Sequence, residues 1–153
     1  MELKYLFVSL IVLMLACSVA AIAAEEDYGS LGDYTFDIPD GYQVVDDTDD
    51  MFTMEADENH TVVVYKLDTA TDFDLFKSLL EDQGCEFGEE DSFQSGSFNV
   101  TQYSYNYLNS QGYLYVCEDG SGASILSAYA ASEDDDAITA DDNPARQVVD
   151  SLE

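Results

Sequence analysis

Alternating apolar and polar residues run along much of this chain, which is the pattern of strands with one face in a core. This alternation, with short apolar runs, predicts strands at 33–39, 42–45, 51–55, 61–67, 87–93, 98–108, 113–118 and 123–131. The segment 61–67 contains three consecutive valines. A continuous β-branched run is typical of a strand that is covered on both faces, so we expect this one to be central in its sheet.

Two segments have helical periodicity instead. The first is predicted to begin at Thr71, an N-cap residue followed by acidic residues, and to end at Gly84. The second is predicted to begin after Asn143, with Pro144 in its first position. Their apolar stripes are Phe73, Phe76, Leu79 and Leu80 in the first helix and Ala145, Val148, Val149 and Leu152 in the second.

Strand runs around only two amphipathic helices predict an α+β domain, with a largely antiparallel sheet on which the helices pack. The domain is expected to cover 33–153, after a polar linker at 25–32. Residues 36–42 read F-x-I-P-x-G-Y, and a strand and helix at 61–83, a run of strands and a closing helix follow. This layout resembles PsbP-type domains and related small secreted lipoproteins. The resemblance implies an α/β/α sandwich and a role that is mostly non-enzymatic in that family.

The N-terminus is apolar from residue 5 to residue 24, after a short start that contains Lys4. With Ala21-Ile22-Ala23 before an acidic stretch, residues 1–24 have the features of a cleaved signal peptide. Two alternatives remain open: a retained hydrophobic leader helix that anchors the chain in a membrane, and lipidation at Cys17. Each predicts an extracytoplasmic domain, secreted or anchored at the cell surface.

The chain has 33 acidic and four basic residues, for a formal net charge of −29. Such a surface repels phosphate backbones and anionic headgroups, which excludes nucleic acid as a partner. Contact with a membrane is expected only through residues 5–24, if they are not cleaved. The self-repulsion also predicts that salt stabilises the fold.

The cysteines and two asparagines suggest covalent modification. Cys85 and Cys117 are the cysteines outside the leader, and in an oxidising compartment we expect a disulfide between them, worth roughly 3–4 kcal/mol. Two free thiols are the alternative. Asn59 and Asn99 each begin an N-x-T sequon, so both are candidate glycosylation sites.

An acidic run offers a possible metal site. Asp46, Asp47, Asp49 and Asp50 supply carboxylate oxygens of the kind that Ca²⁺ prefers. Met51 stands where a calcium-binding loop of the EF-hand kind requires glycine, so the alternative is a solvated loop that attracts cations loosely. Weakly bound Ca²⁺ is the only cofactor that the sequence suggests.

Tyrosines are concentrated late in the chain. Tyr103, Tyr105 and Tyr107 share one side of a predicted strand, and Tyr113 and Tyr115 follow in the next. One interpretation is aromatic pairing inside the sheet. The other is a partly exposed ladder that binds a cell-surface glycan or a protein partner.

No constellation of residues predicts catalysis. His60 is the only histidine and has no nucleophile motif beside it, and the many carboxylates lie in polar runs that do not raise a pKa. A hydrolase is therefore not expected. The sequence predicts a non-catalytic, extracytoplasmic acidic domain that binds at the cell surface, with a cation-binding structural component of the envelope as the alternative.

Overall fold

The computed structural model describes residues 27–67, 71–136 and 138–153. In chain order, its elements are β1 Tyr28–Leu31, β2 Tyr34–Asp37, β3 Gln43–Asp47, β4 Met51–Asp57, β5 His60–Leu67, α2 Thr71–Asp82, β6 Glu86–Ser95, β7 Phe98–Tyr107, β8 Ser110–Glu118, β9 Ser124–Ser132 and α3 Pro144–Ser151. The predicted strands and both predicted helices are present, and the largest extensions beyond their predicted ends are at β6 and β8.

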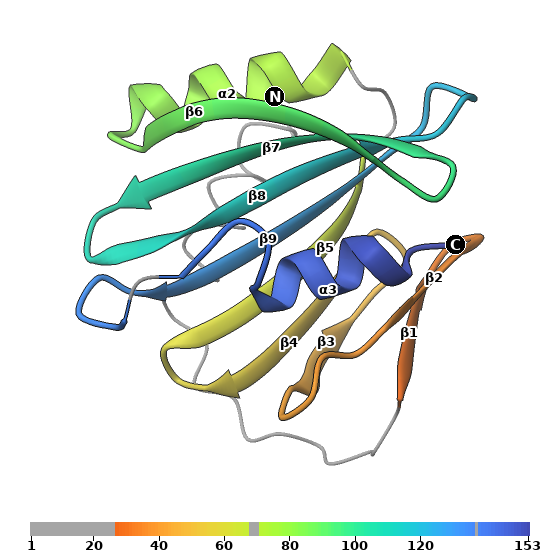
Figure 1. Ribbon diagram of the computed structural model, residues 1–153, viewed down its shortest axis with the longest axis horizontal. Helices are drawn as coiled ribbons and strands as arrows, with labels where there is room; N and C mark the ends of the chain where they lie inside the picture. The colour runs from red at the N-terminus through yellow and green to blue at the C-terminus, as the bar shows by residue number, and fades with distance from the viewer. Residues whose placement is uncertain (1–26, 68–70, 137) are drawn as a thin grey trace.

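Seven strands form one sheet in the order β3-β4-β5-β9-β8-β7-β6, and every neighbouring pair is antiparallel. The short strands β1 and β2 form a separate antiparallel hairpin. Helix α3 and this hairpin lie on one face of the large sheet, and α2 lies on the other (Figure 1). The predicted α+β class with a largely antiparallel sheet is therefore confirmed.

Strand β9 joins the two halves of the large sheet. The chain leaves the sheet at β5, passes through α2 and re-enters at the far edge as β6. It then returns through β7 and β8, and β9 pairs with β8 on one side and β5 on the other. The strand predicted to be central, β5, is third in the order, and β9 holds the middle position.

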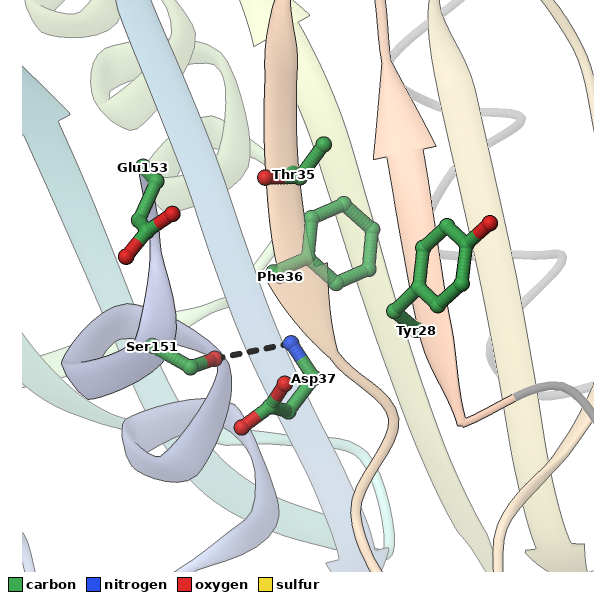
Figure 2. Close-up of a pocket in the computed structure, with 6 residues that line it drawn as sticks. All are labelled: Tyr28, Thr35, Phe36, Asp37, Ser151 and Glu153. Atoms are coloured by element: carbon green, nitrogen blue, oxygen red, sulfur yellow. Dashed lines mark hydrogen bonds between the residues drawn. The ribbon is translucent and has the colours of Figure 1, made fainter.

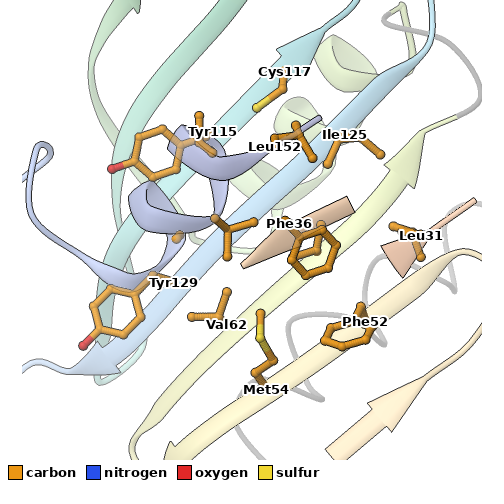
Figure 3. Close-up of a cluster of buried hydrophobic side chains, with 14 of the residues drawn as sticks. Leu31, Phe36, Phe52, Met54, Val62, Tyr115, Cys117, Ile125, Tyr129 and Leu152 are labelled. Atoms are coloured by element: carbon orange, nitrogen blue, oxygen red, sulfur yellow. The ribbon is translucent and has the colours of Figure 1, made fainter. Parts of the chain in front are cut away.

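The face covered by α3 carries the larger of two buried clusters. Val62 and Val64 of β5 point toward this face, and Val63 between them points toward the other, as the period of a strand requires. Figure 3 shows side chains of the hairpin, the sheet and α3 meeting here. Labelled members of the cluster are Leu31, Phe36, Phe52, Met54, Val62, Tyr115, Cys117, Ile125, Tyr129 and Leu152.

Helix α2 covers part of the opposite face through its apolar stripe. Phe73, Phe76 and Leu80 are buried against the sheet, and Leu79 is half-buried. The helix ends where predicted, because Gly84 adopts a φ of +94°, a left-handed conformation that glycine takes at little cost.

Helix α3 begins as its sequence predicts. The side-chain oxygen of Asn143 accepts a hydrogen bond from the amide of Arg146 at 3.0 Å, and Pro144 occupies the first turn. The Asn143 side-chain amide also donates to the Tyr115 hydroxyl at 2.6 Å, which fixes the helix start to β8. The four residues predicted to be buried, Ala145, Val148, Val149 and Leu152, are all in the core.

The prediction of a linker at 25–32 is wrong over its second half. Residues Tyr28–Leu31 form β1, and Leu31 is only 1% exposed because it packs into the cluster under the hairpin. The sequence signal was weak because a four-residue strand with one large buried side chain shows little alternation. The leader at 1–24 lies outside the described residues, and no helix in the described ranges is long and apolar enough to cross a membrane.

A candidate binding groove between β2 and α3

Two adjoining hollows lie where the β1–β2 hairpin meets the end of α3. They have volumes of about 430 and 520 Å³ and share Asp37 and Ser151, so they form one groove. We call this the β2–α3 groove. Figure 2 shows the first hollow, with Tyr28 and residues of β2 on one side and the end of the α3 segment on the other. The groove is lined by Tyr28, Thr35, Phe36, Asp37, Ile38, Pro39, Asp40, Gln147, Asp150, Ser151 and Glu153.

Local hydrogen bonds fix both sides of the groove. The Ser151 hydroxyl accepts from the Asp37 amide at 2.9 Å and donates to the Val148 carbonyl at 3.0 Å (Figure 2 shows the first of these bonds). After β2 the chain turns sharply, because Gly41 adopts a φ of +85° and the Tyr42 amide donates to the Pro39 carbonyl at 3.1 Å. The turn was predicted from its Pro-Asp-Gly sequence, and it places Pro39 and Asp40 at the groove.

The groove is strongly negative. Four carboxylates line it, from Asp37, Asp40, Asp150 and Glu153, and all four residues are exposed. Of these, Asp150 is already paired, since its Oδ1 accepts from Arg146 Nε at 2.9 Å. None of the described residues that line the groove is a lysine or an arginine. Other carboxylates in the groove are therefore available to an external cation.

The groove also offers apolar surface. Tyr28, which lines the first hollow, is 66% exposed, although most large apolar side chains of the described chain are buried. The half-buried side chain of Ile38 lines the second hollow. An exposed aromatic ring beside carboxylates suits a ligand that combines positive charge with aliphatic surface, because a cation binds favourably over a π face.

The sequence did not predict this site because its sides are more than 100 residues apart in the chain. Tyr28 fell within the expected linker, and the end of α3 was assigned only a buried stripe. The one relevant signal was the segment 36–42, which was singled out for family resemblance and which includes Ile38, Pro39 and Asp40.

The acidic run proposed as a metal site lies in the β3–β4 hairpin. Asp46 and Asp47 end β3, Asp49 and Asp50 follow in the turn, and all four are exposed. Thr48 fixes this turn, since its hydroxyl bonds to both the amide and the carbonyl of Met51. No group of three or more His, Cys, Asp or Glu side chains in the described ranges is arranged to hold a metal ion. The structure therefore adds no support to the calcium hypothesis.

Of the two interpretations of the β7 tyrosines, burial inside the fold is confirmed for Tyr103 and Tyr105, and the partly exposed ladder is wrong for them. Tyr103 and Tyr105 are only 5% and 8% exposed, because they lie on the sheet face that α2 covers. Tyr103 stacks on Phe73 with ring centroids 5.5 Å apart, and its hydroxyl donates to Glu90 Oε2 at 2.7 Å. Burial, followed by that hydrogen bond, raises the pKa of Tyr103. Tyr107 is half-buried at the end of the same row.

The tyrosines of the next strand do not join this row. Tyr113 and Tyr115 point to the opposite face, where they stack on each other with centroids 6.5 Å apart. Residues of neighbouring strands share a face only when their register matches, and Tyr105 is paired with Gly112 while Tyr113 is paired with Ser104.

The predicted disulfide is absent, because Cys85 and Cys117 are both free and lie on opposite faces of the sheet. Cys85 is buried beside α2, and Cys117 is buried in the cluster under α3. Burial raises the pKa of the Cys85 thiol to about 11 and that of the Cys117 thiol to about 12, and nearby acidic residues add to both shifts.

Both candidate glycosylation sites are exposed. Asn59 lies in the turn between β4 and β5, where its backbone N–H donates to Asp57 Oδ1 at 2.8 Å. Asn99 lies near the start of β7. Exposure is compatible with modification at either position, which stays a prediction.

Comparisons with known proteins do not identify the chain. No family model matches it, and no curated protein matches it. A solved structure from Bacteroides thetaiotaomicron VPI-5482 is similar, with 12% sequence identity, a TM-score of 0.41 and coverage of 78% of this chain and 44% of that one. The chain thus spans less than half the length of that protein. The resemblance to PsbP-type domains stays a prediction.

Proposed function

We propose that this chain is a non-catalytic, extracytoplasmic domain that binds an extended basic segment of a partner protein at the cell surface. The β2–α3 groove is the proposed binding site. The observation that carries this proposal is the charge of the groove, where Asp37, Asp40 and Glu153 have no ion pair among the described residues and lie with the exposed Tyr28.

The groove favours an extended ligand over a single metal ion. Its carboxylates are distributed along two hollows and are not gathered into a metal-binding group. Successive lysine or arginine side chains could each meet one carboxylate, and one could lie over the ring of Tyr28. The surrounding charge of −29 would accelerate encounter with such a segment at low salt.

A neutral glycan is the competing ligand. It could stack on Tyr28, but it would make no use of the charge that distinguishes the groove. The two ligands respond differently to ionic strength, because exposed charge pairs are screened over about 8–10 Å at 0.1–0.15 M salt and stacking is not.

The proposal is tested with a fluorescent lysine- and arginine-rich peptide and an acidic peptide of the same length. The groove variant is Asp37→Asn with Asp40→Asn, and the matched control is Asp46→Asn with Asp47→Asn, which removes the same charge from residues that do not line the groove. We expect the groove variant to weaken basic-peptide binding roughly five- to tenfold and the control to weaken it less than about twofold.

Equal weakening by both variants would show attraction to net charge alone and would overturn the assignment of the groove. Absence of basic-peptide binding at low salt would overturn the proposed ligand. Binding of neutral cell-surface glycans that is insensitive to salt would assign the groove to the competing ligand.

A further inference from the structure

The ring of His60 lies between two carboxylates from different parts of the chain. Its Nδ1 is 2.7 Å from Asp57 Oδ1 at the end of β4, and its Nε2 is 3.2 Å from Asp135 Oδ2 in the segment after β9. The ring stacks on Tyr129 of β9, with centroids 6.4 Å apart and planes 17° apart. His60 thus connects the β4–β5 hairpin to the segment that leads to α3.

Both carboxylates are held in place by backbone amides. Asp57 Oδ1 accepts from the Asn59 amide at 2.8 Å, and Asp135 Oδ2 accepts from the Ser132 amide at 3.1 Å. The Asn59 bond, and then the bond with His60, hold the pKa of Asp57 below its usual range. Asp57 is therefore ionised at neutral pH and cannot turn away from the ring without losing its own hydrogen bonds.

This arrangement depends on the protonation state of the imidazole. A neutral ring has one N–H and one lone pair, whereas the imidazolium has two N–H donors. With a carboxylate oxygen at each nitrogen, the neutral ring must direct its lone pair toward one anion. We propose that His60 acts as a pH-sensitive clasp, which as imidazolium holds residues 133–136 against the β4–β5 hairpin and releases them on deprotonation.

Further carboxylates lie in the two segments that His60 connects. The hairpin contributes Asp57 and Glu58, and the segment after β9 contributes Glu133, Asp134, Asp135 and Asp136. Tyr129 of β9 is hydrogen-bonded to the hydroxyl of Tyr42, and both have raised pKa values, chiefly through burial, so they stay neutral. In the described chain, Lys77 and Arg146 form their ion pairs with other carboxylates.

The sign of the effect follows from linkage. Because only the imidazolium can donate to both carboxylates, the clasp is complete while both ring nitrogens carry a hydrogen and is lost when one of them gives it up. Contacts that do not titrate limit the release, since the Glu133 amide donates to the Asn109 carbonyl and Gln111 donates to the Ser132 carbonyl. The expected change is a local loosening around Asp135.

The test follows the Ser132 amide by NMR from pH 5 to pH 9. The chain has one histidine, so a step in the histidine range can be assigned by a single substitution. We expect the step in the wild type and in the control Asp134→Asn, and no step in His60→Gln or Asp135→Asn. We also expect hydrogen-exchange protection of this amide, corrected for intrinsic rate, to fall roughly two- to fivefold from pH 6 to pH 8.5 in the wild type only.

A step that persists in His60→Gln would overturn the proposal, because other groups would then cause it. A wild type without a step would overturn it as well. Asp135→Asn keeps the inference falsifiable if His60→Gln does not fold, since it leaves the ring and its hairpin partner intact.

Discussion

Thr35 and Glu153 form a reciprocal pair of backbone hydrogen bonds, each amide donating to the other's carbonyl at 3.0 Å. This pair attaches the segment after α3 to the free edge of β2, the strand that lines the proposed groove. Leu152, next to it, is buried in the core under the hairpin. Leu152 and Glu153 therefore add to the Asp37–Ser151 hydrogen bond in connecting the hairpin to the helix.

Removal of residues 152–153 is expected to lower the free energy of unfolding by about 2–5 kcal/mol. The deletion removes one buried leucine and both backbone bonds. Urea denaturation gives the change. The control is Glu153→Ala, which keeps the backbone bonds and should change stability by less than about 0.5 kcal/mol. A deletion without effect would contradict the importance of this attachment.

Leu108 is expected to be a site of local strain at the tip of the β7–β8 hairpin. It has a φ of +53° and is 69% exposed, so it bears the cost of a left-handed conformation without gaining burial. Leu108→Gly should raise the free energy of unfolding by about 0.5–1 kcal/mol, measured as an increase in the unfolding temperature. The matched control is Leu75→Gly on the exposed side of α2, which should destabilise by about 1 kcal/mol. Equal effects of the two changes would refute the strain.

The two core thiols are expected to resist modification in the native protein. Cys85 and Cys117 are buried, and their raised pKa values of about 11 and about 12 keep them protonated at pH 8. Alkylation followed by peptide mass analysis should show slow labelling of both in native protein and rapid labelling in urea. A mass two hydrogens lower for a linked peptide pair would instead demonstrate a bridge.

The Tyr34–Asp119 bond is expected to give a pH-dependent contribution to stability. The Tyr34 hydroxyl donates to Asp119 Oδ2 at 2.6 Å, and bonds from Ser121 and then Tyr34 lower the pKa of Asp119. A lowered carboxyl pKa contributes stability above the ordinary value of 3.8, which is lost as the pH falls through the lowered value. Tyr34→Phe should therefore cost about 1 kcal/mol at pH 7 and less at pH 2.5, measured by urea denaturation. An equal cost at both pH values would contradict this coupling.

The periodic patterns of apolar residues were sufficient to predict the helices, the strands and the α+β class of the fold. The triple valine predicted a strand covered on both faces, and Phe73, Phe76 and Leu80 predicted the face of α2 that packs on the sheet, because these features depend on neighbours in the sequence. The same locality explains the caps at Asn143 and Gly84.

The groove and the relative positions of the two cysteines could not be predicted from local patterns, because both depend on strand register and long-range packing. Whether Tyr103 shares a face with Tyr113, or Cys85 with Cys117, is decided by the pairing of strands, and a shift of one residue reverses the answer. The groove needed the end of α3 to be placed against β2, which no local pattern of residues reports.

The position of β9 between β5 and β8 has a consequence for the order in which the sheet can form during synthesis. The first three strands of the large sheet and the three that follow α2 can each pair among themselves, but they share no edge until the last strand arrives. Such non-local closure makes folding slow compared with that of a local meander. During synthesis, the two halves of the sheet can therefore join only after β9, Ser124–Ser132, has left the ribosome.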